Sequence, residues 1–380
     1  MPAAVPLSIY VHLPWCAKRC PYCDFHSTVS EDGVPEKRYV DALLRDLEQD
    51  LANGHGREVV SVFLGGGTPS LFRPEAIANL IEGIRSLANI ASDCEISMEC
   101  NPGTVSGTYL QAVREAGITR VSIGVQSFAD SLLEAIGRIH DGEMARQALS
   151  AALDVGFNSV NADLMYGLPQ QSAEQSLADV ETAVQLGAQH ISHYQLTIES
   201  GTSFGAQPPP LPAEDDIALM GERGAAYLSQ CGYQHYEVSA YARAEHRCRH
   251  NLNYWQFGDY IGIGAGAHGK LSDAVTGSTI RTRKIANPER YMATAGKENG
   301  LKQQILSPSD KRTEFLLNAL RLTDGFTPDL FVRTTGLPTA HLTPGLESAR
   351  RAGLLGIEPK RIRPTPMGQR YLNELLQHFV

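Results

Sequence analysis

Six short apolar runs alternate with amphipathic segments in the first half of the chain, and this alternation constrains the fold more than any other feature. The runs begin at Ser8, Val59, Glu95, Arg120, Ser159 and His190. Several are rich in β-branched residues and end in Gly or Pro, as buried parallel strands do. The segments between them, such as EKRYVDALLRDLEQDLA, have helical periodicity. The pattern predicts an α/β fold with a parallel sheet, and six units are too few for a closed eight-unit barrel, so we expect an open, partial barrel.

The pattern changes after PPPLP, Pro208 to Pro212. We expect a helix from about Ala213, then a strand at YEVSAYA, then a Gly- and aromatic-rich functional loop and turn at RHNLNYWQFGDYIGIGAGAHG. From about Pro288 the chain is predicted to be mainly helical, with a β-like hairpin around residues 355–364 and a last helix, as in a winged-helix-like domain. We place the boundary so that residues 1–285 form the partial barrel and residues 286–380 the smaller domain.

The composition is that of an ordinary globular protein, since 42% of the 380 residues are hydrophobic and 20% are charged. We expect no signal peptide and no membrane span, because no stretch approaches about 18 apolar residues. A cytoplasmic location follows as an expectation. From Arg281 to Val380 there are 16 basic and 9 acidic residues, whereas the first 280 residues include 17 and 33. This acidic body argues against broad nucleic-acid binding.

The spacing of three cysteines is the strongest chemical signal. CAKRCPYC places Cys16, Cys20 and Cys23 directly after the first predicted strand. Three thiolates at this spacing can hold three corners of a [4Fe–4S] cluster and leave the fourth iron open. S-adenosylmethionine (SAM) can chelate that iron, and an electron from the cluster can then cleave the sulfonium bond to give a 5′-deoxyadenosyl radical. The alternative is a zinc site with His26 as the fourth ligand. The other four cysteines are scattered along the chain and are predicted to be ordinary thiols. They are Cys94, Cys100, Cys231 and Cys248.

Glycines and polar side chains follow the later predicted strands, where the ligands of barrels gather. The GGGTP loop, Gly65 to Pro69, lets backbone groups approach a ligand such as the amino group of SAM, although a plain turn would have the same sequence. The side chains in question at the later strand ends are Glu99, Gln126, Arg138 and Asp163. Each could pair with the ammonium, carboxylate or ribose hydroxyls of SAM. Each taken alone could equally be a cap or part of a salt bridge.

Two histidines are candidates for a different ligand. His250 lies beside Tyr254 and Trp255 in RHNLNYW, and a neutral imidazole among aromatic rings could be an axial ligand of haem iron. The alternative is a histidine that only hydrogen-bonds a loop. His268 in GAGAHG is a second, weaker candidate.

The motifs CAKRCPYC, GGGTP, MECNP, GVQSF, DLMYGLP and HNLNYW together resemble the HemW-type haem chaperones, a branch of the oxygen-independent coproporphyrinogen III oxidase-like radical SAM family. The resemblance covers nearly the whole chain. It implies a partial (β/α)6 barrel of the radical SAM type followed by a C-terminal HemN-type accessory domain. It also implies that His250, in the HNxxYW pattern, binds haem. By position, it implies a SAM site lined by Tyr10, Tyr22, Gly66, Gly67, Thr68, Glu99, Gln126, Arg138 and Asp163.

The resemblance further implies haem as cargo and haem-requiring membrane enzymes of respiration as clients. An electron donor for the cluster and a homodimer are also implied. The protein would be cytoplasmic and reach the membrane only through its clients. No catalytic residue is assigned.

Two other functions compete with the chaperone. True coproporphyrinogen dehydrogenases, which decarboxylate coproporphyrinogen III oxidatively in porphyrin biosynthesis, have a further cysteine where this chain has Phe25. They also have a longer N-terminal extension than the nine residues that precede Tyr10. We therefore favour the chaperone and leave enzymatic activity open. The third function, nucleic-acid binding by the basic C-terminal domain, is disfavoured because its basic residues are scattered.

Overall fold

The computed structural model describes residues 5–30, 33–52, 56–273, 276–358 and 360–379. Within these residues, twelve strands form one sheet. In spatial order they are β14 (Leu301–Ile305), β13 (Thr279–Lys284), β12 (His268–Ser272), β11 (Asp259–Ile263), β1 (Leu7–Leu13), β4 (Val59–Gly66), β5 (Ile90–Cys100), β6 (Arg120–Gln126), β7 (Ser159–Tyr166), β8 (His190–Gln195), β10 (Ala240–Ala242) and β9 (Gln234–Glu237).

The six predicted strand–helix units are confirmed. Strands β1, β4, β5, β6, β7 and β8 run parallel in this order and coincide with the six apolar runs. Strand β11 pairs parallel with the free side of β1, and antiparallel strands extend both ends of the sheet. Because the order begins at β14 and ends at β9, the described strands form an open barrel, as expected.

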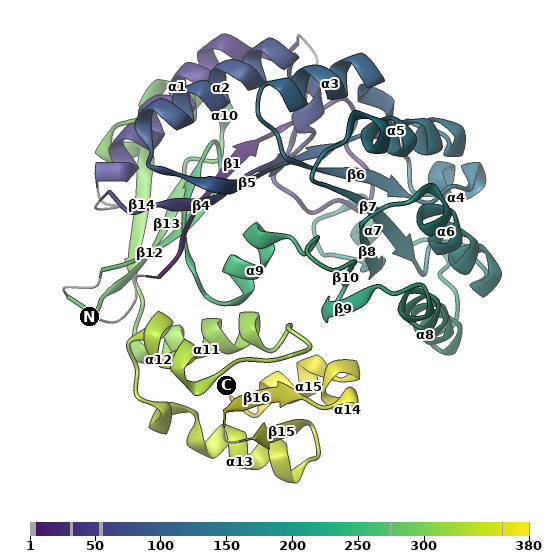
Figure 1. Ribbon diagram of the computed structural model, residues 1–380, viewed down its shortest axis with the longest axis vertical. Coiled ribbons are helices and arrows are strands. Elements are labelled where there is room, and N and C mark those ends of the chain that lie inside the picture. The colour runs from purple at the N-terminus through teal and green to yellow at the C-terminus, as the bar shows by residue number, and fades with distance from the viewer. Residues whose placement is uncertain (1–4, 31–32, 53–55, 274–275, 359, 380) are drawn as a thin grey trace.

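Helices follow the parallel strands and cover the outer face of the sheet in a continuous arc (Figure 1). They are α1 (Glu36–Ala52), α2 (Pro74–Leu87), α3 (Gly107–Glu115), α4 (Asp130–Ala135), α5 (Gly142–Val155), α6 (Ala173–Leu186) and α8 (Glu214–Gln230), with the short α7 (Ser203–Ala206) before α8. Local sequence sets the ends of these helices. In α6, Ser172 and Gln175 form a capping box, and Gly187 ends the helix with φ 98°. The main hydrophobic core lies between this arc and the sheet.

The segment after β10 differs from its prediction. RHNLNYW was expected to be a loop and instead forms helix α9 (Arg249–Trp255), which lies on the inner side of the sheet against β1, β4 and β5 (Figure 1). Its first turn is stabilised from a distance, because the carboxylate of Glu95 accepts hydrogen bonds from the backbone N–H groups of Arg249 and His250. The following residues form β11 and β12 instead of a turn.

The C-terminal part has its own core. It contains α11 (Pro308–Ala319), α12 (Pro328–Thr335), α13 (Thr343–Arg351), the hairpin β15 (Leu355–Glu358) and β16 (Arg361–Pro364), α14 (Pro366–Arg370) and α15 (Leu372–Gln377). The mainly helical composition and the hairpin agree with the prediction. Helix α10 (Pro288–Thr294) contacts α1, and β14 pairs with β13. The second core consists of residues from Leu306 onward together with Phe257, which lies between α9 and β11. The predicted boundary at residue 285 stays a prediction.

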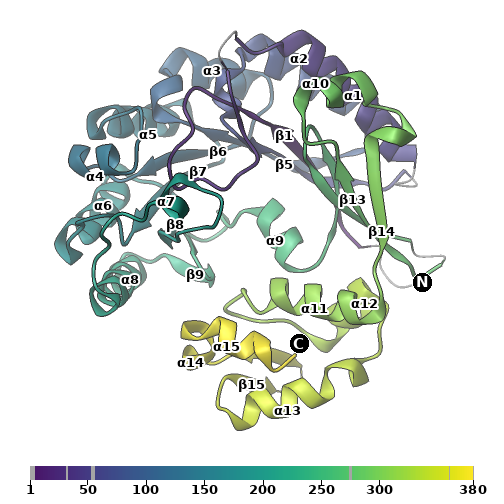
Figure 2. The same ribbon diagram turned by 180° about the vertical axis from the view of Figure 1, so that it is seen from behind.

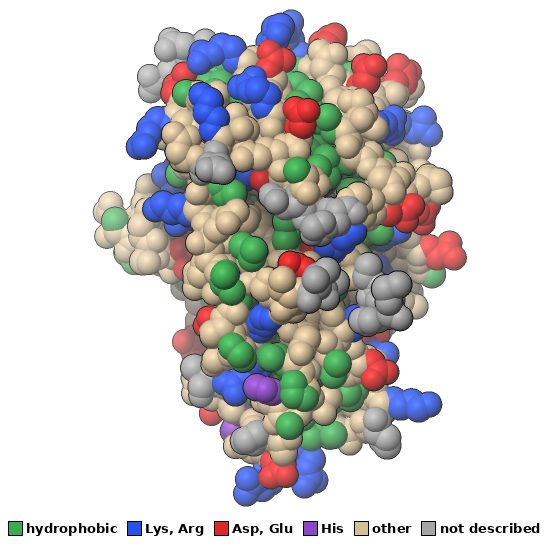
Figure 3. All heavy atoms as spheres, turned by 90° about the vertical axis from the view of Figure 1, so that its left-hand side faces the viewer, with side chains coloured by type: hydrophobic (Ala, Val, Ile, Leu, Met, Phe, Trp, Pro, Cys, Tyr) green, Lys and Arg blue, Asp and Glu red, His purple; other side chains and the backbone are tan. Residues whose placement is uncertain are grey.

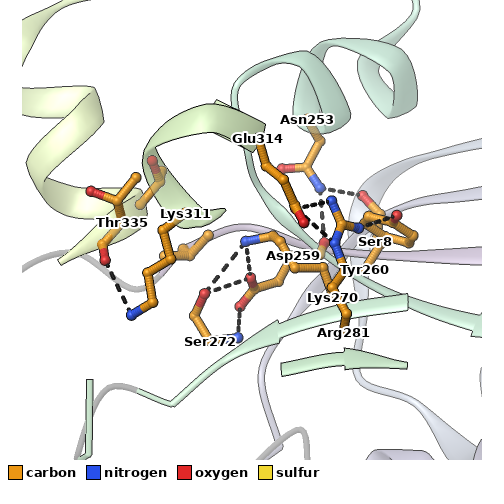
Figure 4. A network of polar contacts seen from close by, with 12 residues as sticks. Ser8, Asn253, Asp259, Tyr260, Lys270, Ser272, Arg281, Lys311, Glu314 and Thr335 are labelled. Atoms are coloured by element: carbon orange, nitrogen blue, oxygen red, sulfur yellow. Dashed lines mark hydrogen bonds and ion pairs between the residues drawn. The ribbon is translucent and has the colours of Figure 1, made fainter. Parts of the chain in front are cut away.

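A polar network joins the barrel to the C-terminal part (Figure 4). Arg281 of β13 forms an ion pair with Glu314 of α11, and Lys311 of α11 donates to the carbonyl of Gly277 at 2.7 Å. Beside them, Lys270 and Asp259 form a buried ion pair at 2.7 Å. Among the described helices, none is long and apolar enough to cross a lipid bilayer.

Candidate functional site

A cavity of about 350 Å³ opens at the carboxyl ends of the parallel strands. Its walls come from the cysteine loop after β1, the glycine loop after β4, the ends of β5 to β8, and the loop after α4. The predicted residues that line it are Cys16, Cys20, Tyr22, Cys23, Gly66, Gly67, Thr68, Glu99, Gln126, Arg138 and Asp163. Segments far apart in sequence therefore meet at one cavity, as expected for the end of a parallel sheet.

The cysteine loop is fixed at both ends and in its middle. The backbone N–H of Thr28 donates to the carbonyl of Pro14 at 2.8 Å, where the short strands β2 (Trp15–Cys16) and β3 (Thr28–Val29) pair. The backbone N–H of Phe204 donates to the carbonyl of Pro21. In the rear view the loop, in dark purple, lies beside α7, which contains Phe204 (Figure 2). The loop therefore presents its thiols from a braced backbone.

The three thiols fit an iron–sulfur cluster better than a single ion. Within the described residues, no group of three His, Cys, Asp or Glu side chains converges closely enough to hold one metal ion. A cube needs no such convergence, because each cysteine binds a different iron. His26, the fourth ligand of the zinc alternative, instead directs Nε2 to the carbonyl of Ala286 at 2.7 Å. Burial raises the pKa of the Cys16 and Cys23 thiols, so binding of iron must displace their protons.

The GGGTP loop requires its glycines. Gly66 has φ +116°, and a Cβ there would lie 2.6 Å from the ring of His12. A Cβ on Gly67 would lie 2.6 Å from the carbonyl oxygen of Trp15. The backbone N–H of Thr68 donates to that same carbonyl at 2.7 Å. The loop thus packs directly on the cysteine loop, leaving no space for side chains between them.

Two carboxylates line the cavity without a direct ion pair, although the charge of the buried Arg120 acts on both from farther away. Neither Glu99 nor Asp163 forms an ion pair with any described residue. Glu99 accepts a hydrogen bond from the backbone N–H of Gly66 at 3.1 Å, yet burial and the nearby charge of Asp163 raise its pKa to about 7. Burial also raises the pKa of Asp163, which accepts from Ser122 at 2.7 Å. A cationic ligand would therefore be attracted to this wall.

Gln126 and Arg138 present unused hydrogen-bonding atoms. Gln126 lies at a bulge between β6 and β7 and has φ 60°, which is unusual for a residue with a side chain. Its Oε1 atom and the Nε atom of Arg138 are buried without a partner among the described residues. Arg138 also donates to Cys20 Sγ at 3.6 Å and to the carbonyl of Gly124 at 3.0 Å. Orphaned polar atoms beside the thiols fit a polar ligand such as SAM.

Three other predicted residues lie outside the cavity lining. The hydroxyl of Tyr10 is 3.0 Å from His12 Nδ1, and neither residue lines the cavity. His250 is only 8% exposed, with Nδ1 3.2 Å from the hydroxyl of Ser61, and burial and the charge of Arg120 lower its pKa to about 3. His268 is exposed at the start of β12. The binding roles predicted for these residues stay predictions.

His12 is a residue that the sequence analysis missed. Its Nε2 donates to the carbonyl of His26 at 2.8 Å, which joins β1 to the end of the cysteine loop. Burial lowers the pKa of His12 to about 4, so the ring is neutral near pH 7. A polar residue within an otherwise buried apolar run was the available signal.

Comparisons with known proteins agree with this geometry. The Radical SAM superfamily model matches residues 10–183, and the HemN C-terminal domain model matches residues 306–371. The superfamily implies a [4Fe–4S] cluster and SAM. Among solved structures, the coproporphyrinogen III oxidase HemN of Escherichia coli superposes with a TM-score of 0.83 over 99% of this chain and 90% of that one. At 24% identity, this likeness shows the fold alone.

Relatives closer in sequence identify the branch. The heme chaperone HemW of Escherichia coli (strain K12) is 44% identical, covering 99% of this chain and 98% of that protein. The heme chaperone HemW of Haemophilus influenzae is 41% identical over 100% and 99% of the two chains. The heme chaperone HemW of Mycobacterium tuberculosis is 39% identical over 75% and 73%. Because the identity to the first two relatives extends over nearly the full length of both chains, this protein belongs to the HemW family of the radical SAM superfamily.

Proposed function

We propose that this protein is a haem chaperone that holds a [4Fe–4S] cluster on Cys16, Cys20 and Cys23 and binds SAM in the adjacent cavity. The observation that supports the cofactors is that three thiols, a glycine loop and two unpaired carboxylates line one cavity. The haem function is supported by the full-length relatives, which are named heme chaperones. Haem is then cargo, passed on to haem-requiring enzymes.

The residues divide the binding of SAM between them. Bound together, the cluster and SAM would supply an electron and a 5′-deoxyadenosyl radical. Glu99 and Asp163 would attract the ammonium group, and the backbone of Gly66, Gly67 and Thr68 would accept its hydrogen bonds. Arg138 would pair with the carboxylate. Tyr22, Gln126 and, from outside the cavity lining, Tyr10 would complete the site.

We keep His250 as the proposed ligand of haem iron. Its lowered pKa leaves the imidazole neutral, which is the form that binds iron. Because Nδ1 contacts Ser61, the ligand atom would be Nε2. Since α9 packs against β1, β4 and β5, the helix must move for haem to reach this atom.

The alternative function is oxidative decarboxylation of coproporphyrinogen III. The side chain at the position of the dehydrogenases' further cysteine, Phe25, is a 60% exposed hydrocarbon that cannot bind iron. Phe25 and the full-length HemW relatives both favour the chaperone. We also propose client enzymes at the respiratory membrane, an electron donor, a homodimer and a cytoplasmic location.

One anaerobic experiment tests the proposed function. Reconstituted protein is titrated with haem, with and without SAM and dithionite, and the same samples are assayed for conversion of coproporphyrinogen III. We expect saturable haem binding and no turnover. Robust turnover of porphyrinogen, or absence of haem binding, would overturn the chaperone.

A further inference from the structure

Two large hydrophobic side chains at the mouth of the cavity are exposed. Among the described residues that line the cavity, Phe25 is 60% exposed and Ile139 is 45% exposed, whereas Met165 and Leu196 in the same lining are 2% exposed. A single exposed hydrophobic residue is ordinary, but two in the lining of one cavity leave apolar surface there that the described chain does not cover.

The loops that carry the two side chains contact each other. Phe25 lies in the cysteine loop, two residues after Cys23. Ile139 follows Arg138, whose guanidinium donates to Cys20 Sγ at 3.6 Å. A Cβ on Gly137 would lie 2.8 Å from the ring of Pro21, so the two loops touch. This apolar surface is therefore attached to the loop that carries the three thiols.

Positive charge lies in the same lining. Lys18 and Arg19 are exposed there, and neither forms an ion pair with any described residue. The only hydrogen bond of Arg19 within the described chain is a long one, 3.4 Å to the carbonyl of Cys23. Asp24 and Glu199 also line the cavity, so an anionic ligand is attracted only where it faces the two cations.

We propose that Phe25 and Ile139 form a docking face for the flat ring of haem, with Lys18 and Arg19 pairing with its two propionates. Haem combines a planar apolar ring with two carboxylates, and the rim offers both complements. The inference rests on the proposed haem function and names where haem docks. This face is separate from His250 and contacts the ring and not the iron, so metal-free protoporphyrin IX should dock as well.

The test compares two double variants with matched controls. Cluster-loaded protein is titrated with haem and with protoporphyrin IX, at equal iron loading, as Phe25→Ala/Ile139→Ala and as Lys18→Gln/Arg19→Gln. The control Ile305→Ala/Leu317→Ala removes two hydrophobic side chains that are 70% and 45% exposed elsewhere. We expect the dissociation constants of both ligands to rise about tenfold in each rim variant and to stay unchanged in the control.

A second ligand separates charge from apolar contact. Haem dimethyl ester, which lacks the propionate charges, should bind wild type and the Lys18→Gln/Arg19→Gln variant equally, and should still lose affinity for the Phe25→Ala/Ile139→Ala variant. If wild type binds no haem, the proposed function itself fails. If wild type binds haem and the rim variants bind it equally well, the chaperone stands and the docking face is wrong.

Discussion

The barrel contains two polar regions that differ in how their carboxylates are satisfied. At the carboxyl ends of the strands, Glu99 and Asp163 have raised pKa values and no ion pair with a described residue. At the junction with the C-terminal part, Asp259 is completely buried, yet it accepts from Lys270 at 2.7 Å (Figure 4). It also accepts from Arg57 at 2.8 Å. We call the second the closed region, because the chain itself pairs Asp259 with two cations, and the first the open region, because no described residue forms a direct ion pair with Glu99 or Asp163.

Because of this difference, the first region is expected to matter for ligand binding and the second for the stability of the fold. A buried carboxylate without a cation costs free energy in the unliganded protein, and that cost falls when a cationic ligand arrives. A buried carboxylate with two cations is already compensated and gains nothing from a ligand. We therefore expect substitutions in the cavity to change cofactor binding, and substitutions around Asp259 to change unfolding.

In the open region, the largest change that we expect is loss of the iron–sulfur cluster. Changing Cys16, Cys20 or Cys23 to Ser removes one thiolate ligand, so iron loading after anaerobic reconstitution should be abolished. Cys94→Ser is the control, because Cys94 lies in β5 outside the cavity lining. Iron content and visible absorbance measure the result. Equal loss in the Cys94 variant would mean that the ligand set is wrong.

In the closed region, the largest loss of stability is expected when the buried ion pair of Asp259 and Lys270 is broken. Asp259→Asn leaves the buried ammonium of Lys270 without its partner, and we expect a loss of about 3–5 kcal/mol in the free energy of unfolding. Urea denaturation followed by tryptophan fluorescence measures it. Lys37→Met, which breaks an exposed pair with Asp41, should cost at most about 1 kcal/mol. If the two variants unfold at similar urea midpoints, the buried ion pair stabilises the fold no more than the exposed pair does.

Much of the open region was predictable, because local patterns determine it. The spacing of the cysteines and the polar residues at strand ends needed only the rule that the ends of parallel strands meet at one edge. The closed region depends on contacts between distant residues. Arg57, for example, pairs with Asp259 across 202 residues of sequence. The same is true of a separate buried cluster, in which Lys284 of β13 pairs with Asp46 and Asp50 of α1 at 2.6 and 2.7 Å.

Helix α9 was mistaken for a loop for the same reason. The glycines and aromatic residues that follow it favour turns, and its first N–H groups have no capping side chain nearby. Glu95, about 155 residues earlier, supplies the acceptor.

The three-dimensional view also shows how the basic side chains are distributed on one face of the molecule. On the face seen in Figure 3, Lys and Arg side chains lie interspersed with other types and form no continuous stripe.

A smaller effect is expected from Glu99→Gln. The ionised carboxylate attracts the ammonium of SAM, so the variant should bind SAM about tenfold more weakly near pH 8. Because the pKa of Glu99 is raised to about 7, wild-type affinity should increase from pH 6 to pH 8, and the variant should lose this dependence. Anaerobic equilibrium dialysis measures both. Identical pH profiles would remove Glu99 from the SAM site.

The same shift predicts the sign of a stability effect. The folded pKa of Glu99 lies above its usual value of 4.5, so folding favours the protonated form. Its contribution to stability is therefore complete below pH 4.5 and is lost as the pH rises through about 7. In cofactor-free protein, Glu99→Gln should flatten the decline of the unfolding midpoint between pH 5 and pH 7.5. Glu115→Gln, on the exposed side of α3, is the control and should leave the decline as in wild type.

The smallest change is expected for His250, which lies in the closed region and is nevertheless proposed to bind a ligand, the haem iron. His250→Ala should weaken haem binding severalfold and shift the Soret band, because the ligand is lost. Ser61→Ala is the matched variant, since it keeps the imidazole and removes its hydrogen bond at 3.2 Å. If α9 must open for ligation, Ser61→Ala should bind haem slightly more tightly, as the cost of opening falls. If the Soret band is unchanged in both variants, His250 is not a ligand of haem iron and has only a structural role.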